Sequence, residues 1–280
     1  LLYVDSTREM MGIGRADFRV MGQDASFSES EFVDIKSIDL TAVLDNMNSY
    51  PALKGVVQNA SAVKTAIGAL GEAAGQKRRA GRVLFAANAS RYLSALGNTY
   101  SNCTSRSHTD ELMIHIFAGL SGGTGSGSIV DAIVQTRKAY PDAKIMVYAM
   151  VAEMRLPKSG MDKGRYYQNC YAALNELSAL QSGRFEPTDV TSEGRTAKLF
   201  STRIKGVADG LVLYSNVNEN GMTVDSLTEL PRLVSDYVFT RVFLLTKEND
   251  DAKDFFRAYS FENMDDFCLE YDERSGRGGK

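Results

Sequence analysis

The sequence contains no tryptophan, and only three cysteines and two histidines occur among its 280 residues. The three cysteines, Cys103, Cys170 and Cys268, lie far apart and have no histidine close by. Their number and spacing argue against a disulfide framework or a zinc site, and they favour a reducing cytoplasm. His108 and His115 are too few for a His-rich metal site and make a Ser-His-Asp triad improbable. We therefore predict no metal site built from the chain's own residues.

Long apolar runs and a strong excess of one charge are also missing. No apolar run approaches the length of a membrane span, and the first residues do not resemble a signal peptide. The net charge of −3 gives no indication of a nucleic-acid partner. With 44% hydrophobic and 24% charged residues, the composition is typical of an ordinary globular protein with a substantial core.

The clearest pattern lies between Leu112 and Met150. Apolar runs at 112–117 and 145–148 fit two buried strands. Apolar residues recur at helical spacing between them, and the opposite face of this helix carries Asp131, Gln135, Arg137 and Lys138. A strand–loop–helix–strand unit implies a parallel sheet. We predict an α/β fold with a doubly wound, mostly parallel sheet and helices on both faces.

A glycine-rich loop joins the first strand to this helix. Its glycines allow a tight turn, and the free N–H groups and helix dipole at a helix N-terminus favour a phosphate. A Gly/Ser-rich loop that caps the helix without any ligand is the alternative. The loop lacks the lysine of a Walker A motif, and its alternating glycines do not fit the dinucleotide fingerprint. The residues expected to contact phosphate are Ser121, Gly122, Gly123, Thr124, Gly125, Ser126 and Gly127.

Residues 118–127, AGLSGGTGSG, resemble the tubulin/FtsZ signature A-G-M-G-G-G-T-G-T-G, with Ser121 in place of the first glycine of the triplet. The resemblance implies a tubulin/FtsZ-type GTP-binding domain of a bacterial or phage protein, with GTP or GDP and Mg²⁺ as cofactors. It also leads us to expect that the family's first strand precedes Leu1 and that its second domain follows Lys280. We divide the chain into a nucleotide-binding domain, 1–245, and an acidic segment with a flexible tail, 246–280.

Two segments before the glycine loop are similar to parts of the same family. The start, LLYVDSTREMM, resembles the second strand and its loop, which implies that Asp5 lies near the ribose or the metal; a helix cap or turn is the alternative. The basic loop at 75–79 resembles the loop that senses the γ-phosphate, and a solvated charge run is its alternative. Its candidate ligand contacts are Gly75, Gln76, Lys77 and Arg78.

Three residues after the glycine loop match family positions that contact the nucleoside. Glu153 lies where the family has a ribose-contacting loop, although a surface glutamate is an equally simple interpretation. Asn216 follows a predicted strand at 211–214 and matches an asparagine that reads the guanine edge; an ordinary turn is its alternative. Asp236 falls on the guanine-contacting acid of the central helix, predicted at 226–245. A carboxylate there selects guanine, because adenine lacks both matching donors.

The acidic segment 250–273 is similar to the loop that enters the next subunit's site and positions the attacking water. Asp265 and Asp266 are the catalytic candidates, and a solvated acidic surface is the alternative. The resemblance implies a GTPase that assembles with itself head to tail and hydrolyses GTP at the subunit interface. Two alternatives stay open: a GTP-binding regulatory module that neither polymerises nor hydrolyses, and an unrelated α/β enzyme that binds another phosphorylated ligand.

Local patterns predict further elements. Residues 51–70 and 164–180 have helical periods, and the second helix carries Tyr167, Cys170, Tyr171, Leu174 and Leu177 on one stripe, which predicts a core face. Residues 197–204 are compatible with a strand, and the polar run at 101–109 predicts an exposed loop.

Overall fold

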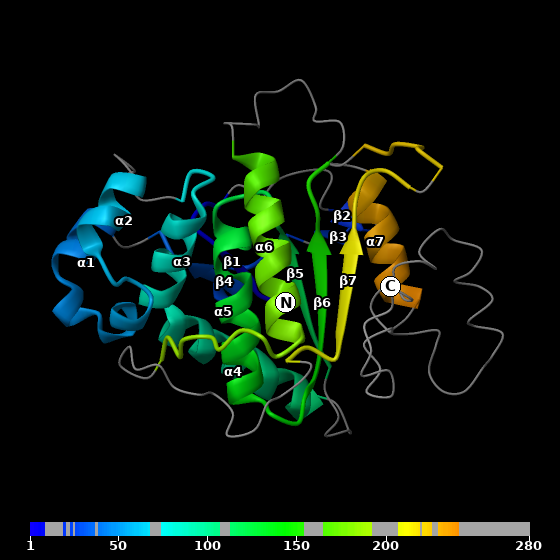
Figure 1. The fold of residues 1–280 in the computed structure, drawn as a ribbon. Helices are drawn as coiled ribbons and strands as arrows, with labels where there is room; N and C mark the ends of the chain where they lie inside the picture. The colour runs from blue at the N-terminus through cyan, green and yellow to red at the C-terminus, as the bar shows by residue number, and fades with distance from the viewer. Residues whose placement is uncertain are drawn as a thin grey trace.

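Three parallel strands form the main sheet of the computed structural model (Figure 1). They are β5 (Met113–Gly119), β6 (Lys144–Met150) and β7 (Gly210–Tyr214), in that order across the sheet. The structure describes residues 1–8, 19–20, 23–24, 26–36, 39–67, 74–106, 113–153, 165–191, 207–218, 220–225 and 229–240.

Side-chain alternation along these strands divides the sheet into two faces. One face packs on α5 (Thr124–Ala139) and α6 (Tyr166–Gln181), and α7 (Glu229–Phe239) covers part of the other (Figure 1). Because successive strand residues point to opposite faces, each helix meets every second residue of a strand. The first face contributes Ile145, Val147 and Ala149 of β6, all fully buried. The second contributes Tyr148 and Val212, which pack on Tyr237 of α7.

A second, smaller parallel pair lies beside the main sheet. It joins β1 (Tyr3–Asp5) to β4 (Phe32–Asp34), and a short antiparallel pair joins β2 (Arg19–Val20) to β3 (Gln23–Asp24). The helices of this half are η3 (Glu29–Glu31), α1 (Leu40–Asp45), η4 (Met47–Ser49), η5 (Pro51–Gly55), α2 (Ala60–Ile67), α3 (Arg78–Ala87) and α4 (Ala89–Arg106). Buried residues of α1, η5, α3 and the start of α4 form one core around the fully buried Ile35, Leu53 and Leu84, and Tyr92 and Leu96 of α4 belong to a separate cluster with Phe85.

The α/β class and the parallel unit at 112–150 are confirmed, and so are the predicted strand at 211–214 and the helix after residue 164. The continuous helix predicted at 51–70 is wrong. The chain instead forms η5, leaves helical structure at 56–59, and starts again at α2, where Asn59 Oδ1 accepts the Ala62 N–H at 2.9 Å. The exposed loop predicted at 101–109 is also wrong for 101–106, which belong to α4; residues 107–109 lie outside the described residues.

Burial differs from the predicted pattern on two helices. Most of the polar face of α5 is buried, and only Lys138 among its four predicted residues is exposed. Asp131 pairs with Arg82, and Gln135 Nε2 donates to Asp189 at 3.1 Å. On α6, Tyr167 and Tyr171 are 45% and 71% exposed, so the predicted core stripe is wrong at these two positions. The predicted strand at 197–204 and the whole of 246–280, with Asp265 and Asp266, lie outside the described residues. Among the helices that are described, none is long and apolar enough to span a membrane.

Candidate functional site

Polar residues gather where the parallel strands end. The glycine loop follows β5, Glu153 follows β6 and Asn216 follows β7. The pairing continues just beyond the strands, since Leu120 N donates to Met150 O and Val151 N to Tyr214 O, both at 2.9 Å. Open α/β sheets bind ligands at this carboxyl edge. The residues after β1 reach the same place, because Ser6 Oγ lies 3.2 Å from Thr124 Oγ1.

Most glycines of the loop are required by close packing. A Cβ on Gly123 would lie 2.8 Å from Lys77 N, and one on Gly125 would lie 2.5 Å from Gly119 O. A Cβ on Gly127 would lie 2.3 Å from Arg78 O. Gly122 differs, because a Cβ there would meet nothing within 4 Å. The loop thus combines glycines that fit it against α3 and β5 with one glycine that borders open space, where a ligand can approach the backbone.

A tight turn in front of α3 lies against this loop. Gly75 and Gln76 both have positive φ, 54° and 59°, and Lys77 N donates to Ala74 O at 2.9 Å. Glycine adopts this backbone freely, whereas a left-handed glutamine costs about 1–2 kcal/mol. Gly81 fixes the distance between α3 and the loop, since a Cβ there would lie 2.1 Å from Gly123 O. The structure therefore brings Gly75 and Gln76 to the glycine loop; that the two loops share one ligand stays a prediction.

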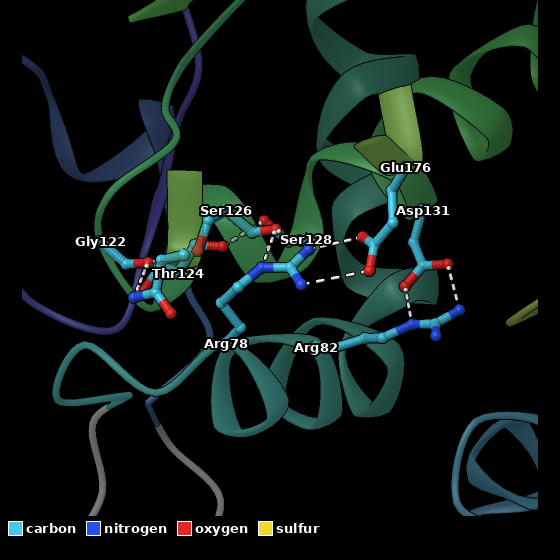
Figure 2. Close-up of polar contacts among 9 residues, drawn as sticks. Arg78, Arg82, Gly122, Thr124, Ser126, Ser128, Asp131 and Glu176 are labelled. Atoms are coloured by element: carbon cyan, nitrogen blue, oxygen red, sulfur yellow. Dashed lines mark hydrogen bonds and ion pairs between the residues drawn. The ribbon is translucent and has the colours of Figure 1, made fainter. Parts of the chain in front are cut away.

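Arg78, a basic residue of the predicted loop, has its side-chain partners within the protein. Arg78 already belongs to α3, and its guanidinium donates to Ser126 O at 2.9 and 3.2 Å and to the Glu176 carboxylate of α6 (Figure 2). Lys77 precedes the helix as its N-cap residue. One turn along α3, Arg82 Nε and Nη2 bind Asp131 at 2.9 and 3.2 Å (Figure 2). Arg78 thus stabilises the glycine loop through the backbone carbonyl of Ser126.

The Arg82–Asp131 pair is an ionic contact inside the molecule. Asp131 has no exposed surface, and the side chain of Arg82 is 33% exposed. Burial raises the pKa of Asp131, while the charge and the hydrogen bonds of Arg82 oppose that rise. The bidentate geometry is the one in which an arginine best compensates a buried carboxylate. The pair therefore joins α3 to α5 directly behind the glycine loop.

The hydroxyls of the loop are mostly occupied within the protein. Ser126 Oγ donates to Gly122 O, and Ser128 Oγ donates to Thr124 O at 2.8 Å (Figure 2). Ser121 is the exception, because its Oγ is buried and has no hydrogen-bond partner among the described residues. A buried hydroxyl without a partner costs roughly 1–3 kcal/mol. Ser121, which stands where the resembling family has glycine, is therefore the loop hydroxyl whose bonding capacity is unused.

The other predicted contacts differ in exposure. Glu153 is 4% exposed, so it is not a surface glutamate, and Tyr166 Oη donates to its carboxylate. Asn216 is also 4% exposed, and its backbone carbonyl oxygen accepts the Val224 N–H at 2.9 Å. Asp5 is half-buried, and its carboxylate accepts from Tyr3 Oη at 2.9 Å and from Ser6 N at 2.6 Å.

Asp236 lies on the exposed side of α7, away from the side chains that pack on the sheet. The backbone carbonyl oxygen of Asp236 accepts a hydrogen bond from Thr240 Oγ1 at 2.7 Å. No contact between Asp236 and Asn216 is seen within the described part of the chain. The two guanine-reading candidates are thus placed on different elements, one buried and one exposed.

Sequence reasoning missed Asn169 of α6. It is 6% exposed, and its side-chain nitrogen lies 2.9 Å from Gln76 O, 3.0 Å from Ser121 O and 3.2 Å from Gly122 O. The available signal was a polar residue on the stripe of Tyr166, Cys170 and Leu177, which is buried at helical spacing. A buried polar side chain needs a partner, and here the partners are the two loops.

The residues present fit a phosphate-bearing ligand. The backbone at Gly122 is open, the Ser121 hydroxyl has no partner among the residues that the structure describes, and α5 starts at Thr124 with the positive end of its dipole toward the loop. No group of three or more His, Cys, Asp or Glu side chains able to hold a metal ion occurs among the residues that the structure describes. Mg²⁺ commonly binds through substrate phosphates and one or two carboxylates, so such a cluster is not required for it.

Comparison with known proteins covers nearly the whole chain. A family model described as "Tubulin like" matches residues 1–266. Among solved structures, CetZ from Methanosaeta thermophila is similar, with a TM-score of 0.41 and 19% identity over 65% of this chain. The chain spans 40% of the length of that protein. None of the curated proteins matches the chain. The family match includes every described element.

Proposed function

The chain belongs to the tubulin-like family, and from this premise we propose that it binds GTP and GDP, assembles head to tail and hydrolyses GTP between subunits. Members of the tubulin/FtsZ superfamily are GTPases. One observation carries the proposal for this chain: the glycine loop, the Gly75–Gln76 turn and the end of β1 meet at the carboxyl edge of the strands. The family match leads us to expect a nucleotide at that meeting point.

The phosphates would lie along the open backbone at Gly122, with the N-terminus of α5 stabilising their negative charge. The Gly75–Gln76 turn would border the γ-phosphate, and the Ser121 hydroxyl would supply a hydrogen bond that a glycine does not offer. Mg²⁺ would neutralise phosphate charge, and Asp5 is the carboxylate that the sequence resemblance assigns to it. These residues bind and orient the ligand and exclude water from one side of it.

Asn216 and Asp236 are proposed to read the guanine base, and Glu153 to bind the ribose. An amide both donates and accepts, and a carboxylate accepts from the two donors that guanine has and adenine lacks. Asp265 and Asp266 are proposed to position water in the neighbouring subunit's site, and they fall inside the family match. Hydrolysis would then require contact between two subunits.

A second candidate is a module that binds GTP but neither assembles nor hydrolyses it. The pairing of Arg78 with Ser126 and Glu176 favours it, because this arginine is engaged in supporting the loop. Arginine often stabilises the transition-state charge in phosphoryl transfer, and a committed arginine does not serve that purpose.

Sedimentation of the protein with GTP, with GDP and without nucleotide separates the candidates. The proposal expects a pellet with GTP and a GTP turnover per molecule that rises with protein concentration. Tight GTP binding without a pellet, and with turnover that stays flat, would support the module. Equilibrium binding should also favour GTP over ATP, and Asp236→Asn should reduce that preference. A preference for ATP in the unmodified protein would contradict the role of Asp236.

A further inference from the structure

One side chain joins the two loops of the candidate site. Asn169 lies in the first turn of α6, and its nitrogen reaches carbonyls of both the Gly75–Gln76 turn and the glycine loop. We propose that Asn169 is a positioning residue that holds these loops in the arrangement that binds nucleotide. The proposal rests on the proposed function for its ligand, although the contacts themselves are independent of it.

The orientation of the Asn169 amide follows from its surroundings. Three carbonyl oxygens, of Gln76, Ser121 and Gly122, lie within 3.2 Å of one side-chain atom. Oxygens accept and do not donate, so the NH₂ group must face them, and its two hydrogens are shared among the three. An isosteric carboxylate at this position would present an oxygen to three other oxygens, and its negative charge would repel them.

The same turn of α6 also binds the loop after β6. Tyr167 Oη donates to Glu153 O at 3.1 Å, and Ala152 N lies 3.2 Å from Cys170 Sγ. Further along α6, Glu176 pairs with Arg78 and so binds α3. Asn169 is therefore the central contact of a helix end that gathers three loops, and both phosphate-facing loops depend on it.

Loss of the Asn169 contact should lower nucleotide affinity in addition to the free energy of unfolding. The turn at Gln76 has a strained left-handed backbone, so it needs external contacts to stay in place. If the binding-competent arrangement falls to about a tenth of the population, the apparent affinity falls about tenfold. A residue with only a structural role would lower stability without this additional loss.

The matched control is Asn88, a second buried asparagine among the described residues that donates to backbone carbonyls. It is likewise 6% exposed, and its Nδ2 lies 2.8 Å from Leu84 O and 3.4 Å from Ile35 O, outside the site. Asn169→Leu and Asn88→Leu should lower the unfolding temperature by similar amounts. GTP binding, measured at equilibrium, should weaken on the order of tenfold in Asn169→Leu alone. Equal affinity in both variants would overturn the proposal. Asn169→Asp serves as a second variant should leucine prevent folding.

Hydrogen exchange without nucleotide separates this proposal from the proposed function. In Asn169→Leu, the amides of Lys77 and Gly127, which bond Ala74 O and Gly123 O, should exchange faster together, while Asn88→Leu leaves both unchanged. If the unmodified protein bound no GTP, the proposed function would fail and the exchange result would still decide the role of Asn169. Unchanged protection of both amides would refute it.

Discussion

Gly81 sets how closely α3 approaches the glycine loop, and its replacement by alanine tests that packing most directly. An added Cβ would lie 2.1 Å from Gly123 O, 2.8 Å from Gly123 C and 3.0 Å from Thr124 Cα. All three atoms belong to the backbone, so no side chain can rotate away, and α3 must move from α5. Overpacking of a dense core costs typically about 1–3 kcal/mol, occasionally more.

The helix propensity of alanine opposes this cost. Gly81 lies inside α3, where alanine is favoured over glycine by about 1 kcal/mol. With a clash at or above the top of the usual range, we expect Gly81→Ala to lose about 2 kcal/mol of unfolding free energy. With an unfolding entropy of about 2.1 cal/mol/K per residue over 280 residues, that corresponds to a fall in unfolding temperature of roughly 3–4 °C.

Gly97→Ala is the matched control. Gly97 lies inside α4, and its added Cβ would meet only the Tyr140 hydroxyl at 3.5 Å, an ordinary contact. This variant should gain about 1 kcal/mol from helix propensity. Urea denaturation followed by circular dichroism measures both variants. A Gly81→Ala protein as stable as the Gly97→Ala protein would refute the packing argument.

The remaining predictions concern ligand approach and buried charge. Gly122→Ala should leave stability unchanged, because its Cβ meets open space, yet weaken GTP binding on the order of tenfold in an equilibrium titration. Arg82→Leu should cost about 3–5 kcal/mol in urea denaturation at pH 7, because it leaves the carboxylate of Asp131 buried and unpaired. Burial raises the pKa of Asp131, so the folded state binds the proton of this carboxyl more tightly than the unfolded state. The stability lost in Arg82→Leu should therefore grow as the pH rises through the folded pKa of Asp131. A loss that does not depend on pH would contradict the argument from buried charge. Burial lowers the pKa of His115, so the folded state binds this proton less tightly than the unfolded state and loses stability as the pH falls below about 6.5. In His115→Gln, the urea midpoint should therefore depend less on pH in that range.

The unit between residues 112 and 150 was the part of the fold that the sequence predicted best. The strands and the helix between 112 and 150 follow from apolar periodicity and a glycine-rich junction, which act within a few residues. The end of the 18-residue helix α4 was predicted as a loop, because 101–106 is polar and the buried residues of this helix, Ala89, Tyr92 and Leu96, come earlier. The buried face of α5 depends on Arg82, a partner 49 positions away, which no periodicity reveals.

The candidate site divides in the same way. Gly122 and Ser121 were predicted because the loop motif is contiguous in sequence. The engagement of Arg78 was not predicted, since its carboxylate partner Glu176 lies 98 positions away on another helix. Asn169 was missed for the same reason, because its acceptors belong to two distant loops. Contacts across such separations arise only once the sheet has ordered the helices around it.

The close fit of Gly81 and Gly127 between α3 and α5 also has a mechanical consequence. With no side chain at either contact, the two helices lie backbone against backbone, so neither can shift toward the other. We therefore expect a shift of the glycine loop toward α3 to move this helix with it. That helix has ten residues, so its junction with α4 lies about 15 Å from the loop. The glycines that let the loop pack are thus expected to couple the position of the loop to that of the α3–α4 junction.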